Sequence, residues 1–202
     1  MTSHQGERAL VVVAHPRGAS LTAKAADRVH RQLKAAQYEV DLLDLYAEEF
    51  DPRLGVADEP DWNDPGKTYS EEVRAHMARI DAADAIAVVF PVWWFAPPAI
   101  VKGWIDRVWN HGFAYGGAES RLAAKRMLWL GLAGGSGEAY EANGLTAMMD
   151  VQLRMGVSNF CGIADAELRL VHDVENAEAE QVLSGAEVAA AEFLVDRALT
   201  GR

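Results

Sequence analysis

Apolar and polar positions along this chain follow two kinds of pattern. Five short runs are mostly apolar, and the clearest of them, LVVVA and AIAVVF, are typical of strands buried on both faces of a parallel sheet. The predicted strands are Leu10–Ala14, Val40–Leu45, Ala85–Phe90, Met127–Ala133 and Glu167–Val171. Elsewhere apolar side chains recur every three or four residues, as on an amphipathic helix. The predicted helices are Leu21–Leu33, Ser70–Ile80, Ala99–Asn110, Leu145–Gly156 and Glu178–Leu199.

Strand and helix alternate five times in this pattern. The sequence therefore predicts an α/β fold, a doubly wound five-stranded parallel sheet with helices on both faces. We expect one domain over residues 1–202. In this architecture ligands bind beyond the carboxyl ends of the strands, where the strand order reverses. The loops after the first, third and fourth predicted strands are therefore the candidates for a binding site.

The first of these loops, His15–Thr22, has the composition of a phosphate site. Ser20 and Thr22 offer hydroxyls beside the free N–H groups of a helix start, and His15 and Arg17 can add positive charge. Neither GxGxxG nor GxxxxGK[ST] occurs there. Taken alone, this loop is explained more simply as an ordinary capped turn with a surface histidine, because capping residues are common.

The second loop, Pro91–Pro98, is unusually aromatic. Its sequence PVWWFAPP holds two tryptophans and a phenylalanine, and each such ring has about 150–250 Å² to bury. The rings either fold back into the core or a dimer interface, or form the wall of a slot for a planar ligand. The loop alone does not separate these alternatives.

The third loop contains GGSG at Gly134–Gly137 and is followed by Tyr140. Glycines let a backbone approach a ligand closely and expose N–H groups, although a flexible turn would look the same. Together the three loops are suited to hold a phosphate group, to stack on a flat ring and to bring backbone N–H groups close to a ligand. A flavin is a cofactor with all three requirements.

Charge and composition narrow the class of protein. Half of the 202 residues are hydrophobic. The net charge is −11, and this negative charge disfavours nucleic acid and anionic lipid as partners. Residues 47–72 carry seven of the eleven excess negative charges, and we interpret this segment as a solvated surface excursion. The longest apolar run, Ala85–Phe95, is too short to span a bilayer, so direct membrane insertion is not expected. The six histidines show no metal-ligand spacing, and no metal is expected.

Cellular location is indicated by two features. The lone Cys161 excludes an internal disulfide and is expected to be a buried packing residue rather than a redox thiol. The first residues lack the pattern of a signal peptide. Both features favour the cytoplasm.

Five segments carry a family resemblance: VVVAHPRGASLT, FPVWWFAPPAIVKGWIDRVW, GFAYGG, GGSGEAY and FCGI. They extend from about residue 10 to residue 163, and the segment with the tryptophans is the most specific. On these segments the chain resembles the flavodoxin-like NAD(P)H:quinone oxidoreductase family. That family includes bacterial quinone reductases and the ancillary reductases of potassium efflux systems.

The resemblance implies a flavodoxin-like fold, a non-covalent FAD or FMN, and a homodimer whose pocket is shared between the subunits. It implies ping-pong hydride transfer from NADH or NADPH to quinones or similar small electrophilic acceptors. The residues that it places around the flavin phosphates are His15, Ser20, Leu21 and Thr22. Those that it places around the isoalloxazine are Pro91, Val92, Trp93, Trp94, Phe95, Ala133, Gly134, Gly135 and Tyr140. Tyr140, Trp94 and Gly135 are expected to take part in catalysis.

Two departures from the family pattern are visible. The best-known eukaryotic members carry a histidine six residues after the tyrosine, where this chain has Thr146. They also carry threonines where this chain has Leu132 and Ala133. The first loop and FCGI look closest to FAD-binding members, so FAD is expected, with FMN as the alternative. No residue can be assigned to a choice between NADH and NADPH. A second hypothesis is a regulatory subunit of a potassium efflux or other membrane system, with little turnover of its own.

Overall fold

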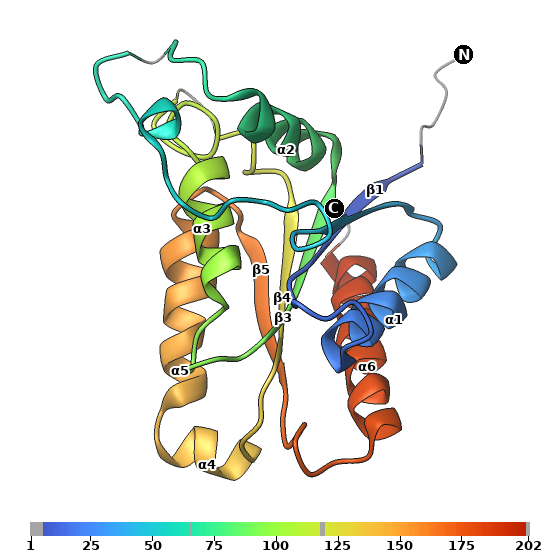
Figure 1. Ribbon diagram of the computed structural model, residues 1–202. Helices are drawn as coiled ribbons and strands as arrows, with labels where there is room; N and C mark the ends of the chain where they lie inside the picture. Colours follow the sequence, from blue (N-terminus) through green and yellow to red (C-terminus); the bar gives the residue numbers. More distant parts are fainter. Residues whose placement is uncertain (1–5, 65, 118–119, 201–202) are drawn as a thin grey trace.

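The structure is a computed structural model that describes residues 6–64, 66–117 and 120–200, with side chains up to residue 195. Its centre is a sheet of five strands, all paired in parallel in the order β2-β1-β3-β4-β5 (Figure 1). The strands are β1 (Arg8–Val13), β2 (Glu39–Asp44), β3 (Ala85–Pro91), β4 (Arg126–Leu132) and β5 (Asp165–Val171). The predicted fold class is confirmed, and the strand bounds differ from the predicted ones by at most two residues.

The continuous apolar character of β1 follows from its central position. Leu10 and Val12 pack into one hydrophobic cluster, whereas Ala9, Val11 and Val13 pack into the cluster on the other face of the sheet. Successive side chains of a strand point to opposite faces. A central strand of a doubly covered sheet must therefore be apolar at every position.

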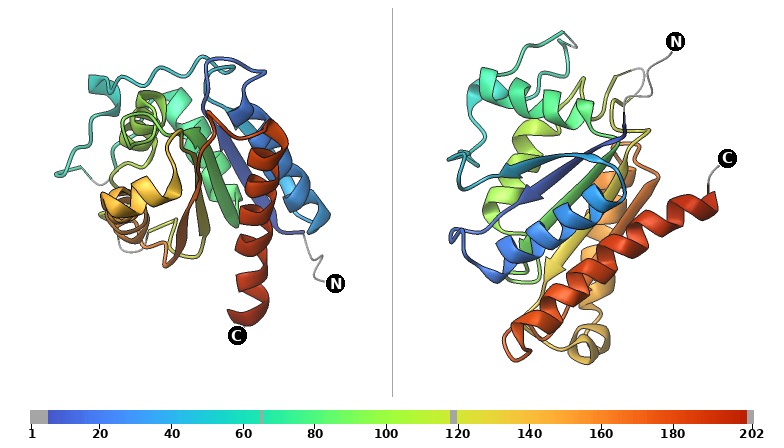
Figure 2. Two further views of the ribbon diagram at one scale, coloured as in Figure 1. Left: turned by 90° about the horizontal axis from the view of Figure 1, so that it is seen from below. Right: turned by 90° about the vertical axis from the view of Figure 1, so that its right-hand side faces the viewer.

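The helices form a layer on each face of the sheet. On one face, α1 (Leu21–Ala35) and α6 (Ala179–Thr200) lie side by side (Figure 2), joined by an ion pair between Arg28 and Glu187 at 2.6 Å. The other face is covered by α2 (Glu71–Ala82), α3 (Ala99–Val108), α4 (Gly137–Ala142), α5 (Leu145–Asp150) and the π-helix η2 (Val151–Asn159). None of the helices in the described residues has the length and apolar character needed to span a bilayer.

The predicted helix Leu145–Gly156 is present, but only its first part is an α-helix and it extends to Asn159. Gly144 has a φ of +66°, which separates α4 from α5, and α5 continues into η2. In η2 the Ser158 hydroxyl donates to the Leu153 carbonyl at 3.0 Å, five residues earlier, and accepts from Trp129 Nε1 at 2.9 Å. A buried serine that bonds at this spacing fits the wider turn of a π-helix. Apolar periodicity alone does not show such a turn.

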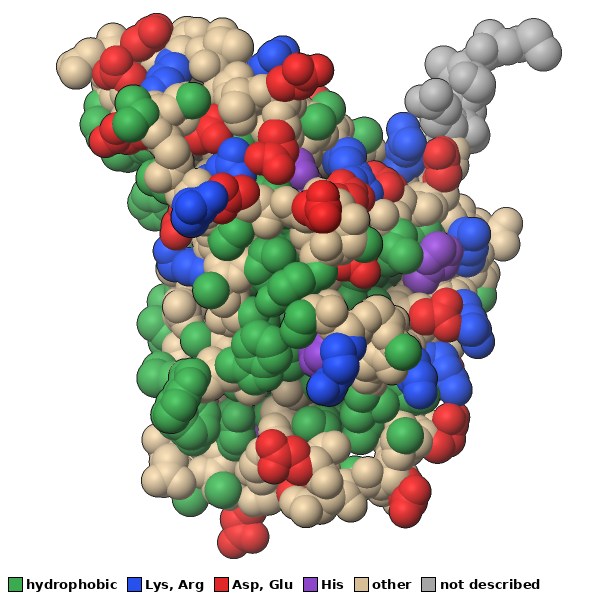
Figure 3. Space-filling model, in the orientation of Figure 1, with side chains coloured by type: hydrophobic (Ala, Val, Ile, Leu, Met, Phe, Trp, Pro, Cys, Tyr) green, Lys and Arg blue, Asp and Glu red, His purple; other side chains and the backbone are tan. Residues whose placement is uncertain are grey.

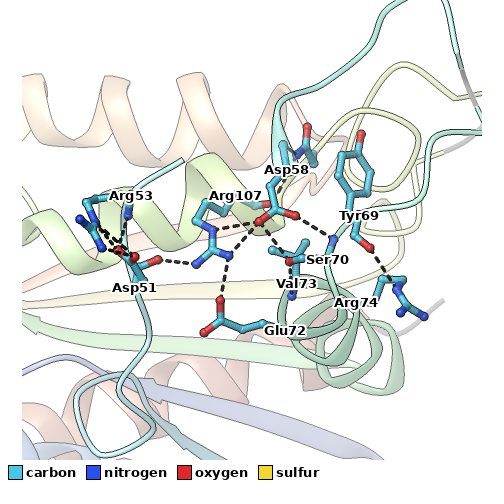
Figure 4. Close-up of polar contacts among 10 residues, drawn as sticks. Asp51, Arg53, Asp58, Tyr69, Ser70, Glu72, Val73, Arg74 and Arg107 are labelled. Carbon is cyan, nitrogen blue, oxygen red and sulfur yellow. Dashed lines mark hydrogen bonds and ion pairs between the residues drawn. The ribbon is translucent and has the colours of Figure 1, made fainter. Parts of the chain in front are cut away.

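The acidic excursion between β2 and α2 is fixed to α3 by buried charge. Arg107 on α3 lies between Asp58 and Glu72, at 2.8 and 2.7 Å, and also donates to the Asp51 carbonyl (Figure 4). Asp58 also accepts from the Ser70 backbone N–H at 2.8 Å. The excursion was expected to be solvated, but the side chains of Asp58 and Arg107 are only 3% and 7% exposed. This part of it is an anchored segment.

Candidate active site

The three candidate loops meet at the carboxyl edge of the sheet. The Val92 N–H donates to the Leu132 carbonyl at 2.8 Å, which ties the second loop to the end of β4. The His15 ring contacts Trp93 with centroids 6.0 Å apart, and Phe95 contacts Tyr140 at 5.8 Å, both edge to face. Aromatic contacts thus link the first loop to the second and the second to the residues after the third.

The Trp94–Phe95 pair forms a strained turn. The N–H and carbonyl groups of Trp93 and Ala96 are mutually hydrogen-bonded at 3.0 and 3.1 Å, and the two residues between them have φ values of +53° and +58°. Two positive φ values at the centre of a hairpin are those of a type I′ turn, which favours asparagine and glycine. For bulky residues each such conformation costs on the order of 1–3 kcal/mol.

The strained turn holds its aromatic side chains out of the core. Trp94 is 94% exposed, and Trp93 and Phe95 are 43% and 42% exposed. Of the alternatives for this loop, burial in the chain's own core is therefore wrong. Pro91, at the end of β3, is buried, and Val92 is half-buried behind the turn. The loop therefore exposes three aromatic side chains, of which Phe95 contacts Tyr140.

The glycine loop has two free donors. Within the described residues, the N–H groups of Gly134 and Gly135 make no hydrogen bond. A Cβ at Gly135 would lie 3.2 Å from the Tyr140 ring, so a larger residue would displace that ring. Ala133 is different: it is fully buried, its N–H donates to Val171 at 2.8 Å and its carbonyl accepts from Val174 at 3.1 Å. The free backbone N–H groups, which we call the glycine cradle, are therefore those of Gly134 and Gly135.

The first loop ends in a capped helix. The Ser20 hydroxyl accepts from the Ala23 N–H at 3.1 Å, as predicted, while the N–H groups of Leu21 and Thr22 make no hydrogen bond among the described residues. Burial and the neighbouring Arg17 charge lower the pKa of His15. His15 is therefore neutral at pH 7, and the exposed Arg17 supplies the positive charge at this helix start.

Tyr140 lies between Phe95 of the aromatic loop and His172. Its side chain is buried, and burial raises its pKa, so the hydroxyl remains protonated at neutral pH. The hydroxyl makes no hydrogen bond within the described residues. On the side away from Phe95, the ring packs edge to face on His172, with centroids 4.9 Å apart.

Two polar residues near this edge have unpartnered atoms. Thr146 Oγ1 and His172 Nδ1 are buried without a hydrogen-bond partner in the described structure. Sequence reasoning missed His172, although it directly follows β5 and therefore stands at the same sheet edge as the other loops. No group of three metal-binding side chains occurs among the described residues.

A comparison with known families matches residues 7–194 to the family described as having a flavodoxin-like fold. The chain belongs to this family. An NAD(P)H oxidoreductase of Escherichia coli, YcaK, is 40% identical over 164 residues, covering 81% of this chain and 83% of its own length. Rat NAD(P)H dehydrogenase [quinone] 1 is 32% identical over 203 residues, covering 88% of this chain and 74% of its own.

The fold also agrees with that of a solved structure. The NAD(P)H:quinone oxidoreductase from Methanothermobacter marburgensis superposes with a TM-score of 0.82 at 26% identity. The alignment covers 92% of this chain and 95% of the other. The two chains therefore share one fold over almost their whole length.

Proposed function

We propose that this protein is a flavin-dependent NAD(P)H oxidoreductase that reduces quinones or similar small electrophilic acceptors. The observation that carries the proposal is the Trp94–Phe95 turn, which exposes an aromatic surface at a conformational cost beside the free N–H groups of Gly134 and Gly135. Strain of this kind persists where the surrounding structure enforces it, commonly at binding sites. The family relationship supports the same function.

The residues present fit a flavin. The unpaired N–H groups of Leu21 and Thr22 suit its phosphate, because the start of a helix favours anions. The aromatic turn suits its flat ring, and the glycine cradle, which side chains would fill, suits its polar edge. FAD is the expected form and FMN the alternative. A bound flavin would supply the chemistry for hydride transfer between NAD(P)H and the acceptor.

The chain's own contributions are binding, orientation and charge stabilisation. Trp94 and Phe95 provide a surface for stacking and limit access of water on that side. The N–H groups of Gly134 and Gly135 are donors for negative charge that develops at the polar edge of the ring. Tyr140, whose raised pKa keeps its proton, is a further donor. Gly135, Trp94 and Tyr140 are accordingly the proposed catalytic residues.

The working unit is proposed to be a homodimer. Large apolar side chains are exposed along α5, η2 and the residue after it, namely Met148, Val151, Met155 and Phe160, each between 48% and 68% exposed. Apolar side chains gather in Figure 3 over the area that α3 and α5 occupy in Figure 1. Contiguous apolar surface of this kind commonly marks an interface. It adjoins the aromatic loop, so a second subunit there would help to enclose the pocket.

The test is cofactor uptake followed by turnover. Purified protein incubated with FAD or FMN should turn yellow and then oxidise NADH or NADPH in the presence of a quinone. Gly135→Val, whose side chain would collide with Tyr140, should lose both properties, while Gly18→Val, at an open position in the first loop, should retain turnover. Failure of the wild type to bind either flavin contradicts the proposal. Tight flavin binding without turnover favours the regulatory alternative.

A further inference from the structure

A cavity of about 370 Å³ lies at the amino edge of the sheet, away from the three candidate loops. Its lining comes from residues 66–69 at the end of the acidic excursion, from α2, and from the segment that follows α3. α2 ends just before β3 begins, and the segment after α3 leads into the start of β4, which places the cavity at this edge. In Figure 1, α2 and the excursion lie at the opposite end of the molecule from α4. The volume is sufficient for a small ligand.

The charged side chains of this cavity are mostly basic. Lys67, Arg74 and Arg121 line it, and among the described lining residues Asp81 is the one carboxylate. Asp81 accepts two hydrogen bonds from the Arg121 guanidinium, and these bonds lower the pKa of Asp81. The one acid is therefore paired with one of the bases. Lys67 and Arg74 form no ion pair within the described structure, so the cavity is positive in a chain of net charge −11.

Arg74 offers donors that suit an anion. Its Nε donates to the Tyr69 carbonyl at 3.1 Å, which holds the guanidinium beside the excursion (Figure 4). Its two terminal nitrogens make no hydrogen bond to any residue that the structure describes. Lys67 Nζ donates to the Glu59 carbonyl rather than to a carboxylate, and lies 6.0 Å from the centroid of the Tyr69 ring. A guanidinium with two free terminal nitrogens is suited to bind a carboxylate or a phosphate through paired hydrogen bonds.

The buried part of the cavity is apolar. Tyr69, Met77 and Phe113 line it, and each is 8% exposed. The Tyr69 hydroxyl donates to the His111 carbonyl at 2.7 Å, so its one proton is already used within the chain. Basic groups and apolar side chains thus line the same cavity. A ligand that matches both has an anionic group joined to an apolar body.

We propose that this cavity binds a small amphipathic anion, with its carboxylate or phosphate group on Arg74 and Lys67 and its ring-sized apolar body against Met77 and Phe113. The site is distinct from the proposed flavin site, and the inference does not depend on the proposed function. The ligand contacts the excursion, α2 and the segment after α3, which are distant in sequence. Because it binds only where these segments are together, it stabilises their attachment to one another.

The first experiment compares four probes on the full-length chain by isothermal titration calorimetry. Benzoate and phenyl phosphate carry both the ring and the anionic group, benzyl alcohol carries the ring alone, and inorganic phosphate carries the anion alone. At least one ring-bearing anion should bind about tenfold or more tightly than either control, and its affinity should fall with added salt. The tighter of benzoate and phenyl phosphate shows whether carboxylates or phosphate esters are the preferred class. Equal affinity for benzyl alcohol and for both ring-bearing anions overturns the inference.

Two pairs of variants locate the binding. Arg74→Gln removes the charge but keeps an amide donor, and should weaken binding of the preferred anion about tenfold. Arg31→Gln, at an exposed position on α1, is its matched control and should bind as the wild type does. Ala78→Phe places a ring in the cavity and should abolish binding. Ala75→Phe adds the same ring at an exposed position of α2 that does not line the cavity, and should leave the affinity unchanged.

A measurement on the wild-type chain is independent of how the variants fold. In ¹H–¹⁵N spectra, addition of the preferred anion should move the backbone signals of Thr68 and Gly112, which line the cavity, and leave those of Gly134 and Gly135 in place. Movement confined to Gly134 and Gly135, or equal affinity in Arg74→Gln, Ala78→Phe and the wild type, places the anion elsewhere and overturns the inference. Neither result bears on flavin uptake, so the proposed function stands or fails separately.

Discussion

Trp94 combines a left-handed backbone conformation with an indole ring that is almost wholly exposed. Neither feature stabilises the isolated chain, because the backbone is strained and the ring remains in contact with water. Selection for stability alone would favour glycine or asparagine at this position. The proposed stacking of this residue on the flavin accounts for both features.

Replacing Trp94 separates stability from function. Trp94→Ala should change the melting temperature by no more than a few degrees, while flavin affinity and turnover fall about tenfold or more through lost stacking. Trp94→Gly should melt at a higher temperature than Trp94→Ala, because glycine adopts positive φ without strain. Thermal denaturation and steady-state kinetics measure these effects. Equal destabilisation of both variants with unchanged kinetics would show that the indole has only a packing role.

Cys161 is buried, as expected, and burial raises its pKa to about 11. Since the thiolate is the reactive form, native protein at pH 8 should react with iodoacetamide at least about a hundredfold more slowly than an ordinary thiol of pKa about 8.5. Urea-denatured protein provides the control and should react at the ordinary rate. Fast labelling of the native chain would show an activated thiol.

Thr146 has a buried hydroxyl without a partner in the described structure. Thr146→Val keeps the shape and removes the unsatisfied group, so the free energy of unfolding should rise by up to about 1–3 kcal/mol. Turnover should change only modestly, and Thr146→Ala should show the same small kinetic effect. Urea denaturation and kcat measure the two quantities. A several-hundredfold loss of rate would mean that Thr146 performs the task of the family's histidine.

At the scale of elements, the excursion before α2 depends on the Asp58–Arg107 pair. Burial tends to raise the pKa of Asp58, but the Arg107 guanidinium and the Ser70 donors outweigh it and lower the pKa. A lowered folded-state pKa contributes stability that is present above the unfolded value of about 3.9 and is lost as the pH falls through the folded value. The attachment of the excursion to α3 should therefore weaken in acid.

Variants of this pair should show that dependence. Arg107→Met leaves the Asp58 carboxylate buried without its partner and should lower the free energy of unfolding at pH 7 by about 3–5 kcal/mol. Asp58→Asn removes the titrating group, so its stability should fall less steeply between pH 5 and pH 3 than that of the wild type. Denaturant titrations at each pH provide the comparison. Parallel pH curves for the wild type and Asp58→Asn would contradict the assignment.

At the scale of the whole molecule, the exposed apolar side chains of α5 and η2 require a partner surface in the proposed dimer. Met155→Glu should shift the protein from dimer to monomer in sedimentation experiments and weaken flavin binding, because a charge buried in an apolar interface is costly. Val188→Glu, at an exposed position on α6 across the sheet, is the matched control and should remain dimeric. A monomeric wild type would contradict the proposed dimer.

The sequence determined the sheet and the order of its loops. Runs such as Leu10–Ala14 and Ala85–Phe90 identify strands because a central strand must be apolar toward both helix layers. The caps Ser20 and Ser70 were also predictable, since capping depends on side chains within one turn. The alternation of strands and helices then identified the three loops as candidates for the binding site. Of these, the aromatic loop was the most specific part of the family resemblance.

The tertiary structure alone decided the features that depend on contacts distant in sequence. In the π-helix Ser158 accepts a hydrogen bond from Trp129 of β4, and the buried Asp58 is paired with Arg107 of α3. The packing of His172 on Tyr140 joins the residue after β5 to α4. Local periodicity and propensity report only on neighbours along the chain. The physical role of such residues is set by groups that the fold brings together from elsewhere.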